Sequence, residues 1–158
     1  MIVVCDIDGC IVDPCKYVER YLLKPKKDWS EYYKHTLEFE KVGFVLGILD
    51  GLWRESDVYF VTGRPESNRE LTLLWFRHNT PFAIGDGHLL MRPKGDYRRT
   101  YNLKLEWYEK LKPDLIIEDE PETIAAAVFH GFTNILQVYG HRQTERDGTP
   151  GEQGEVLV

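Results

Sequence analysis

The sequence lacks long hydrophobic runs, has only three cysteines and carries no excess of positive charge. No apolar run approaches the roughly eighteen residues that a membrane-spanning helix needs, so we expect no membrane segment and a cytoplasmic location. The cysteines, Cys5, Cys10 and Cys15, fit neither a CxxC metal site nor an even-numbered disulfide framework, which favours reduced thiols. The five histidines show no HxxxH spacing, so no zinc site is indicated. A formal charge of -6 means that any polyanionic substrate must be held locally.

The composition is that of a folded domain. The chain has 158 residues, of which 42% are hydrophobic and 13% aromatic, enough to form a buried core. We expect one domain over residues 1–140. The residues from Gly140 onward are rich in glycine, polar and charged side chains, which predicts a flexible tail over 141–158.

Short β-favouring runs alternate with helical segments along the chain. The runs cover residues 2–5, 57–61, 89–91, 114–117 and 133–138. This alternation is typical of a parallel sheet with helices on both faces, so we expect a Rossmann-like three-layer α/β sandwich. Mostly helical residues, about 13–54, separate the first run from the second, which predicts a small helical, cap-like elaboration after strand one. Helix caps are expected at Asp28 and at Ser67 or Asn68, with Lys104 in the first turn of a helix over 102–111.

Polar side chains follow three of the β-runs. Asp6 and Asp8 follow the first, Thr62 and Arg64 the second, and the acidic run 118–120 the fourth. The carboxyl ends of parallel strands meet at one edge of a sheet, where ligands bind in such folds. The Asp8-Gly9 pair alone is equally consistent with an ordinary turn. Together, the three ends predict a site for a divalent cation and a phosphate, with a carboxylate available to attack phosphorus.

These residues resemble the four motifs of the haloacid dehalogenase-like phosphohydrolase superfamily, over about residues 1–140. The resemblance implies Asp6 in DxDG as nucleophile and Mg2+ ligand, and Asp8 as general acid and base and as a backbone ligand of the metal. It implies Thr62 in FVTGRP as a phosphate-binding hydroxyl and Lys104 as the motif lysine. In the acidic run IIEDE it implies Asp119 as the metal ligand, with Glu118 as a supporting carboxylate.

Two residues depart from the pattern of this superfamily. Cys10 stands where most members have Thr or Val, and Glu118 where many have Gly or Asp. The second departure leaves open whether Glu118 or Asp119 is the main metal ligand, and we favour Asp119.

Within the superfamily, the chain is similar to the 3'-phosphatase domain of bacteriophage polynucleotide kinases. The similarity rests on TGRP, on LLMRPKGDYR and on the absence of a long cap insertion. It implies a phosphomonoester on a nucleotide or on a nucleic-acid end. No GxxxxGK[ST] phosphate-binding loop of a kinase domain occurs in the sequence.

Further residues are candidates for the substrate site. Gly63 and Arg64 lie in the phosphate-binding turn, where Arg64 either contacts substrate or pairs with a motif carboxylate. Arg20 either reaches over the site or is a solvated helix residue. The basic, aromatic loop 92–101 is either a groove for a sugar-phosphate or base, or a solvated loop. Trp29, Tyr32 and Tyr33 are expected mainly in helix packing.

The sequence thus predicts a Mg2+-dependent phosphatase that hydrolyses phosphomonoesters through an aspartyl-phosphate on Asp6. The expected partner is a nucleotide or the 3'-phosphate end of a polynucleotide. The alternatives are a non-catalytic phosphate-binding or interaction module on the same fold, and a phosphotransferase that uses the same nucleophile.

Overall fold

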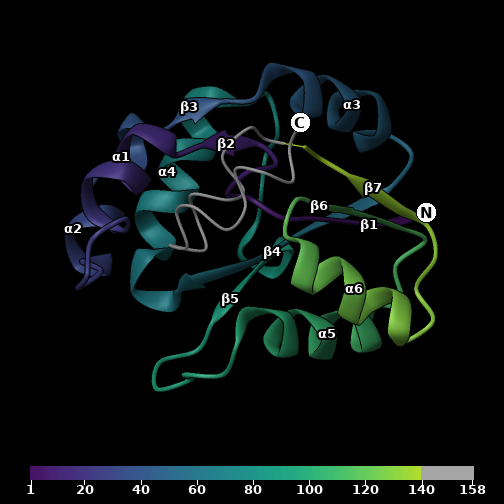
Figure 1. Cartoon of the computed structure of the whole chain (residues 1–158). Helices are drawn as coiled ribbons and strands as arrows, with labels where there is room; N and C mark the ends of the chain where they lie inside the picture. The colour runs from purple at the N-terminus through teal and green to yellow at the C-terminus, as the bar shows by residue number, and fades with distance from the viewer. Residues whose placement is uncertain (140–158) are drawn as a thin grey trace.

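A parallel five-stranded sheet forms the centre of the protein (Figure 1). The computed structural model describes residues 1–139, so the expected tail lies outside the described residues. The strand order is β5-β4-β1-β6-β7. The strands are β1 (Ile2–Cys5), β4 (Asp57–Pro65), β5 (Leu89–Arg92), β6 (Leu115–Glu118) and β7 (Ile135–Gln137).

The central strand β1 is buried because both of its faces are covered. It pairs in parallel with β4 and β6, with Val3 aligned with Val58 on one side and Leu115 on the other. Val3 and Cys5 belong to one hydrophobic core and Val4 to a second. A strand that contributes to a core on each face has no polar side, which explains its continuous apolar sequence.

Helices cover both faces of the sheet, so the expected three-layer α/β sandwich is confirmed. Helices α5 (Thr100–Leu111) and α6 (Pro121–Phe129) lie together on one side (Figure 1) and bury Leu105, Tyr108 and Ala127 against Val4. The other core is filled from α1 (Cys15–Tyr21), α3 (Gly43–Trp53) and α4 (Arg69–Asn79). Within residues 1–139, no helix is long and apolar enough to cross a membrane.

The segment between β1 and β4 is mostly helical, as expected. It contains α1, α2 (Trp29–Lys34), a 3-10 turn η1 (Thr36–Glu38) and α3. It also contains a small antiparallel pair, β2 (Val12–Asp13) with β3 (Glu40–Lys41), which we did not predict because two-residue strands have no hydrophobic periodicity. Asp28 caps α2 as expected, and its Oδ1 accepts a hydrogen bond from the Glu31 backbone N–H at 3.1 Å.

Two expectations about helix starts were wrong. Asn68 precedes α4 without capping it, because its side chain instead hydrogen-bonds with the Thr36 and Thr72 hydroxyls and the Tyr33 carbonyl. Helix α5 begins at Thr100 rather than Asn102, which moves Lys104 into the second turn.

Candidate active site

The turn after β1 places two carboxylates at the carboxyl edge of the sheet. The Asp6 backbone N–H still donates to the Ile117 carbonyl of β6 at 2.9 Å, so Asp6 continues the strand. The chain then folds back through Gly9, whose φ of 89° is in the region that favours glycine. Asp6 and Asp8 are two residues apart, and both are buried.

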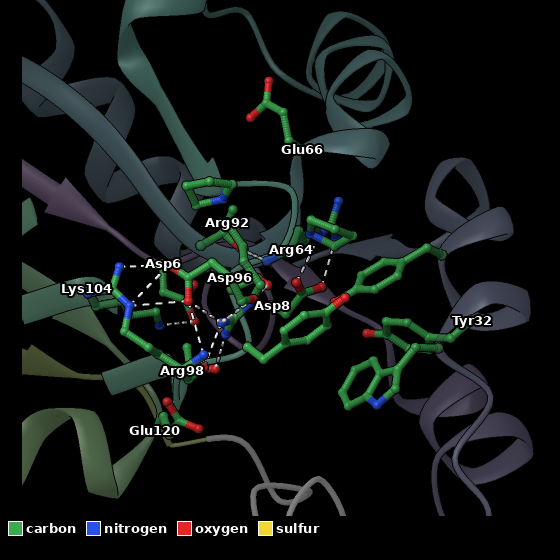
Figure 2. A pocket seen from close by; sticks show the side chains of 18 of the residues that line it. Asp6, Asp8, Tyr32, Arg64, Glu66, Arg92, Asp96, Arg98, Lys104 and Glu120 are labelled. Carbon is green, nitrogen blue, oxygen red and sulfur yellow. Dashed lines mark hydrogen bonds and ion pairs between the residues drawn. The ribbon is translucent and has the colours of Figure 1, made fainter. Parts of the chain in front are cut away.

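A cavity of about 920 Å³ opens at this edge (Figure 2). Among its lining residues are most of the predicted site residues: Asp6, Asp8, Thr62, Gly63, Arg64, Lys104 and Asp119. They come from the ends of β1 and β6, from the last part of β4 and from α5. The tertiary structure therefore brings these residues together although they are spread over more than one hundred positions of the sequence.

Lys104 lies between two buried carboxylates. Its Nζ is 3.0 Å from Asp6 Oδ2 and 2.7 Å from Glu118 Oε2. Burial alone would lower the pKa of Lys104, but the charges of Asp6 and Glu118 raise it well above its usual value. Lys104 is thus a fixed positive charge beside the predicted nucleophile.

Glu118 lies beside Lys104 and is not among the described residues that line the cavity. Its Oε2 accepts hydrogen bonds from Lys104 and from the Tyr108 hydroxyl, while Oε1 accepts from the backbone N–H groups of Asp119 and Glu120. These four donors engage both oxygens of the carboxylate, which holds Lys104 and shapes the turn after β6. We therefore revise the expectation for Glu118 from a supporting metal ligand to a partner of Lys104.

The side chains of Asp6, Asp119 and Cys10 lie close enough to hold a cation. One oxygen of each carboxylate and the Cys10 sulfur all lie within 4.8 Å of one another, and all three residues are buried. Two carboxylate oxygens suit Mg2+, which prefers hard ligands and retains several waters. Burial, together with the neighbouring Cys5 thiol, raises the pKa of Cys10 well above its usual value, so Cys10 remains a neutral thiol. The two carboxylates fit the expected Mg2+ site.

Asp8 forms a bidentate ion pair with Arg64. The Arg64 Nε and Nη2 atoms lie 2.8 Å from Asp8 Oδ2 and Oδ1, respectively. Arg64 also donates to the Thr72 hydroxyl at 3.1 Å, and its guanidinium lies 5.5 Å from the centre of the Phe39 ring. Of the two roles considered for Arg64, the structure shows the ion pair with a motif carboxylate, and Arg64 lines the cavity as well.

The turn at Thr62 and Gly63 is closely packed. The buried Thr62 Oγ1 accepts a hydrogen bond from the Arg64 backbone N–H at 3.2 Å and keeps its own proton available for donation. A Cβ at Gly63 would lie 3.0 Å from Cγ2 and 3.1 Å from Oγ1 of Thr100, at the start of α5. Glycine at this position therefore allows the turn to approach the helix.

The basic, aromatic loop borders the cavity, but two of its cations already have partners in the loop and in the adjoining β4 and α5. Arg92 donates to the carbonyls of Gly63 at 3.1 Å and Arg98 at 2.6 Å. Arg98 pairs with Asp96 at 2.6 Å and with Glu106 at 2.9 Å. The hydrogen bond from Arg98 lowers the pKa of Asp96 to about 2. Arg92 and Arg98 thus brace the loop that forms this side of the cavity.

Two features differ from the sequence-based expectation. Arg20 is exposed, its guanidinium lies 5.3 Å from the centre of the Tyr21 ring, and it is not among the described residues that line the cavity. Conversely, Trp29, Tyr32 and Tyr33 line the cavity besides packing against one another. Their helical spacing indicated mainly packing, and the expected cap-like elaboration after strand one was the sequence signal that this segment could cover the site.

No known sequence family matches the chain, and no characterised relative was found. Several solved structures are similar to this chain in fold. A chain of a Pnkp1/Rnl/Hen1 complex has a TM-score of 0.66 at 19% identity, over 88% of this chain and 46% of that one. A second structure, described as the Pnkp1/Rnl/Hen1 RNA repair complex, has a TM-score of 0.61 at 20% identity, over 89% of this chain and 43% of that one. The protein thus spans less than half the length of these two chains.

Two further structures match over most of the chain. A class C acid phosphatase from Bacillus anthracis, with tungstate bound, has a TM-score of 0.64 at 12% identity, over 98% of this chain and 76% of that one. A haloacid dehalogenase-like hydrolase from Streptococcus pneumoniae has a TM-score of 0.58 at 15% identity, over 99% of this chain and 96% of that one. At these identities the likeness shows the fold alone, which this chain shares with the acid phosphatase and with the haloacid dehalogenase-like hydrolase.

Proposed function

We propose that the protein is a Mg2+-dependent phosphomonoesterase that uses Asp6 as nucleophile and acts on a nucleotide or on the 3'-phosphate end of a polynucleotide. One observation carries this proposal. The carboxylate of Asp6 lies at a cavity of about 920 Å³, held by Lys104 at 3.0 Å and close to Asp119. A nucleophile, a fixed cation and a second carboxylate in one place are what phosphoryl transfer to an aspartate requires.

Four residues of the site have roles in this reaction: Asp6, Asp8, Thr62 and Lys104. The Asp6 carboxylate attacks phosphorus, which forms an aspartyl-phosphate as the bond to the leaving oxygen breaks. Asp8 must first take up a proton, although its pair with Arg64 favours the ionised form, before it gives that proton to the leaving oxygen. It then takes a proton from the water that hydrolyses the aspartyl-phosphate. Thr62 donates its hydroxyl hydrogen to a phosphate oxygen, and Lys104 balances the charge of Asp6 and phosphate.

Asp6 and Asp119 would hold Mg2+, which neutralises phosphate charge when bound. The resemblance to the superfamily makes the Asp8 backbone carbonyl a further expected ligand. Arg64 engages the Asp8 side chain. Arg64 thereby acts as a positioning residue, since it determines where the oxygens of the acid and base group point.

The nucleotide substrate is supported by three considerations. The TGRP and LLMRPKGDYR segments are similar to a polynucleotide 3'-phosphatase domain, and both segments contribute residues to the cavity lining. One of the similar structures belongs to a complex described as an RNA repair complex. The cavity volume also far exceeds the space that a phosphate alone would need.

The proposal is tested by phosphate release with Mg2+ and with EDTA. The panel contains 3'- and 5'-mononucleotides, oligonucleotides phosphorylated at either end, and glycerol 2-phosphate. We expect Mg2+-dependent release that Asp6→Asn abolishes and Asp50→Asn, at an exposed position of α3, leaves unchanged. Full turnover by Asp6→Asn would refute the proposed nucleophile.

Two alternatives give different results in the same assay. A binding module would bind nucleotide without releasing phosphate from any substrate. A phosphotransferase would transfer the phosphoryl group to added alcohol or nucleoside in place of water. Acid-quenched protein from a reaction with labelled substrate should carry a hydroxylamine-sensitive phosphate on wild type and none on Asp6→Asn.

A further inference from the structure

The cavity has an ionic floor and an apolar wall. The floor contains the paired charges of Asp6 with Lys104 and of Asp8 with Arg64. The wall comes from α1 and α2 and from the turn after α1, which contribute Val18, Leu22, Trp29, Tyr32 and Tyr33. In Figure 2, Tyr32 and Lys104 lie on opposite sides of Asp8. A ligand that satisfies both surfaces has a phosphate at one end and a flat, weakly polar group at the other.

Trp29 is the residue of this wall best placed to stack on a ring. Its side chain is 47% exposed, whereas Tyr32 is 3% exposed and belongs to the core. Tyr33 lies against Trp29 with ring centres 5.9 Å apart and planes 24° apart, and Tyr32 meets Trp29 edge-on at 5.8 Å. Two aromatic neighbours therefore hold the indole, and Trp29 still has exposed surface at the cavity.

The rim of the cavity is poorly suited to a long polyanion. Lys104 and Arg64 are paired in the floor, Arg92 donates to the carbonyls of Gly63 and Arg98, and Arg98 pairs with Asp96 and Glu106. Among the described basic residues of the lining, Lys94 remains as the one without an ion pair. Proteins that hold a single-stranded backbone use several available cations along a groove. Binding energy here must come mainly from the terminal nucleoside.

We propose that the apolar wall is a base-binding subsite, in which Trp29 stacks on the base of the nucleotide that carries the scissile phosphate. The protein thus recognises one terminal nucleoside and makes few contacts with the phosphates beyond it. This inference rests on the proposed function for the position of the phosphate. Base stacking on an aromatic side chain tolerates any base, so base identity has little influence on turnover.

The first test compares kcat/KM for a 3'-mononucleotide with kcat/KM for glycerol 2-phosphate, which has no ring. Loss of one base-aromatic stack should lower this ratio about 5- to 150-fold in Trp29→Ala, through KM for the nucleotide, and Trp29→Phe should restore most of it. Phe44→Ala is the matched control, because Phe44 on α3 is 75% exposed and does not line the described cavity. An unchanged ratio in Trp29→Ala would overturn the inference.

The second test measures salt dependence and length dependence. We expect a 3'-phosphorylated single-stranded DNA of ten nucleotides to have nearly the KM of the mononucleotide. A plot of its log binding constant against log salt concentration should have a slope no steeper than about -1.4, the value for two neutralised phosphates. A steeper slope, or a much lower KM for the longer DNA, would show a backbone groove instead.

A binding measurement separates this inference from the proposed function. In Asp6→Asn protein, a 3'-mononucleotide should quench tryptophan fluorescence, and the additional Trp29→Phe change should remove that quenching. Quenching without phosphate release by wild type would overturn the proposed phosphatase and leave the base subsite standing. Phosphate release with no quenching attributable to Trp29 would overturn the base subsite alone.

Discussion

Replacing Arg64 by methionine tests the buried ion pair at the centre of the site. Met has nearly the length of the arginine stem but neither its charge nor its donors, so Asp8 would lose both of its 2.8 Å hydrogen bonds. Arg64 is 1% exposed and Asp8 is 8% exposed, so water could reach the unpaired Asp8 carboxylate only from the cavity side. Removing one member of such a pair leaves a buried charge unpaired, which costs about 3–5 kcal/mol.

This loss in the free energy of unfolding corresponds to a large fall in Tm. For a protein of this size each kcal/mol changes Tm by about 2–4 °C, so Arg64→Met should lower Tm by about 6–20 °C. Asp8→Asn together with Arg64→Met removes both charges, and the double variant should therefore be more stable than the sum of the two single losses predicts, by about 1–3 kcal/mol.

Circular dichroism during heating and during urea unfolding measures both quantities. Arg77→Met is the control, because Arg77 is exposed on α4 and its loss should change stability by less than about 0.5 kcal/mol. A loss below about 1 kcal/mol for Arg64→Met, or additive losses in the double variant, would refute the argument that Asp8 depends on Arg64 for its charge.

Three further predictions concern the same edge of the sheet. Burial raises the pKa of Cys5 and Cys10 above 9.0, so at alkaline pH the folded state keeps protons that the unfolded chain releases. The free energy of unfolding should therefore fall above pH 9, by up to about 1.4 kcal/mol per pH unit for each thiol. Asp119→Asn should weaken Mg2+ binding in calorimetry, whereas Glu118→Gln should mainly lower Tm, because Lys104 loses its 2.7 Å partner. Gly63→Ala should cost about 1–3 kcal/mol in urea unfolding, because its Cβ would lie 3.0 Å from a methyl group.

Further variants test these three predictions. Cys10→Ser should flatten the alkaline slope, because it removes one of the two buried thiols. Gly47→Ala, with no atom within 4 Å of the added Cβ, should be neutral or stabilising. An alkaline slope that Cys10→Ser leaves unchanged, stronger Mg2+ loss in Glu118→Gln than in Asp119→Asn, or a neutral Gly63→Ala would contradict the respective prediction.

The local features of the fold were predictable because they depend on short stretches of sequence. The apolar run before Asp6 predicted β1, and the Gly9 turn and the Asp28 cap followed from residue type. The small pair β2–β3 was missed because two residues carry no periodic signal. The Asn68 cap was wrong because buried partners from the distant η1 segment and from α4 compete for its side chain.

The sequence by itself determined the fold class and which polar residues stand at strand ends, because both depend on periodicity and on the common direction of parallel strands. Only the tertiary structure decided how those groups are paired. In the folded chain Arg64 pairs with Asp8, and both oxygens of Glu118 accept hydrogen bonds. Trp29 and the rest of the apolar wall line the cavity. These pairings join side chains from different strands and helices, and such contacts depend on distances that exist only after the chain has folded.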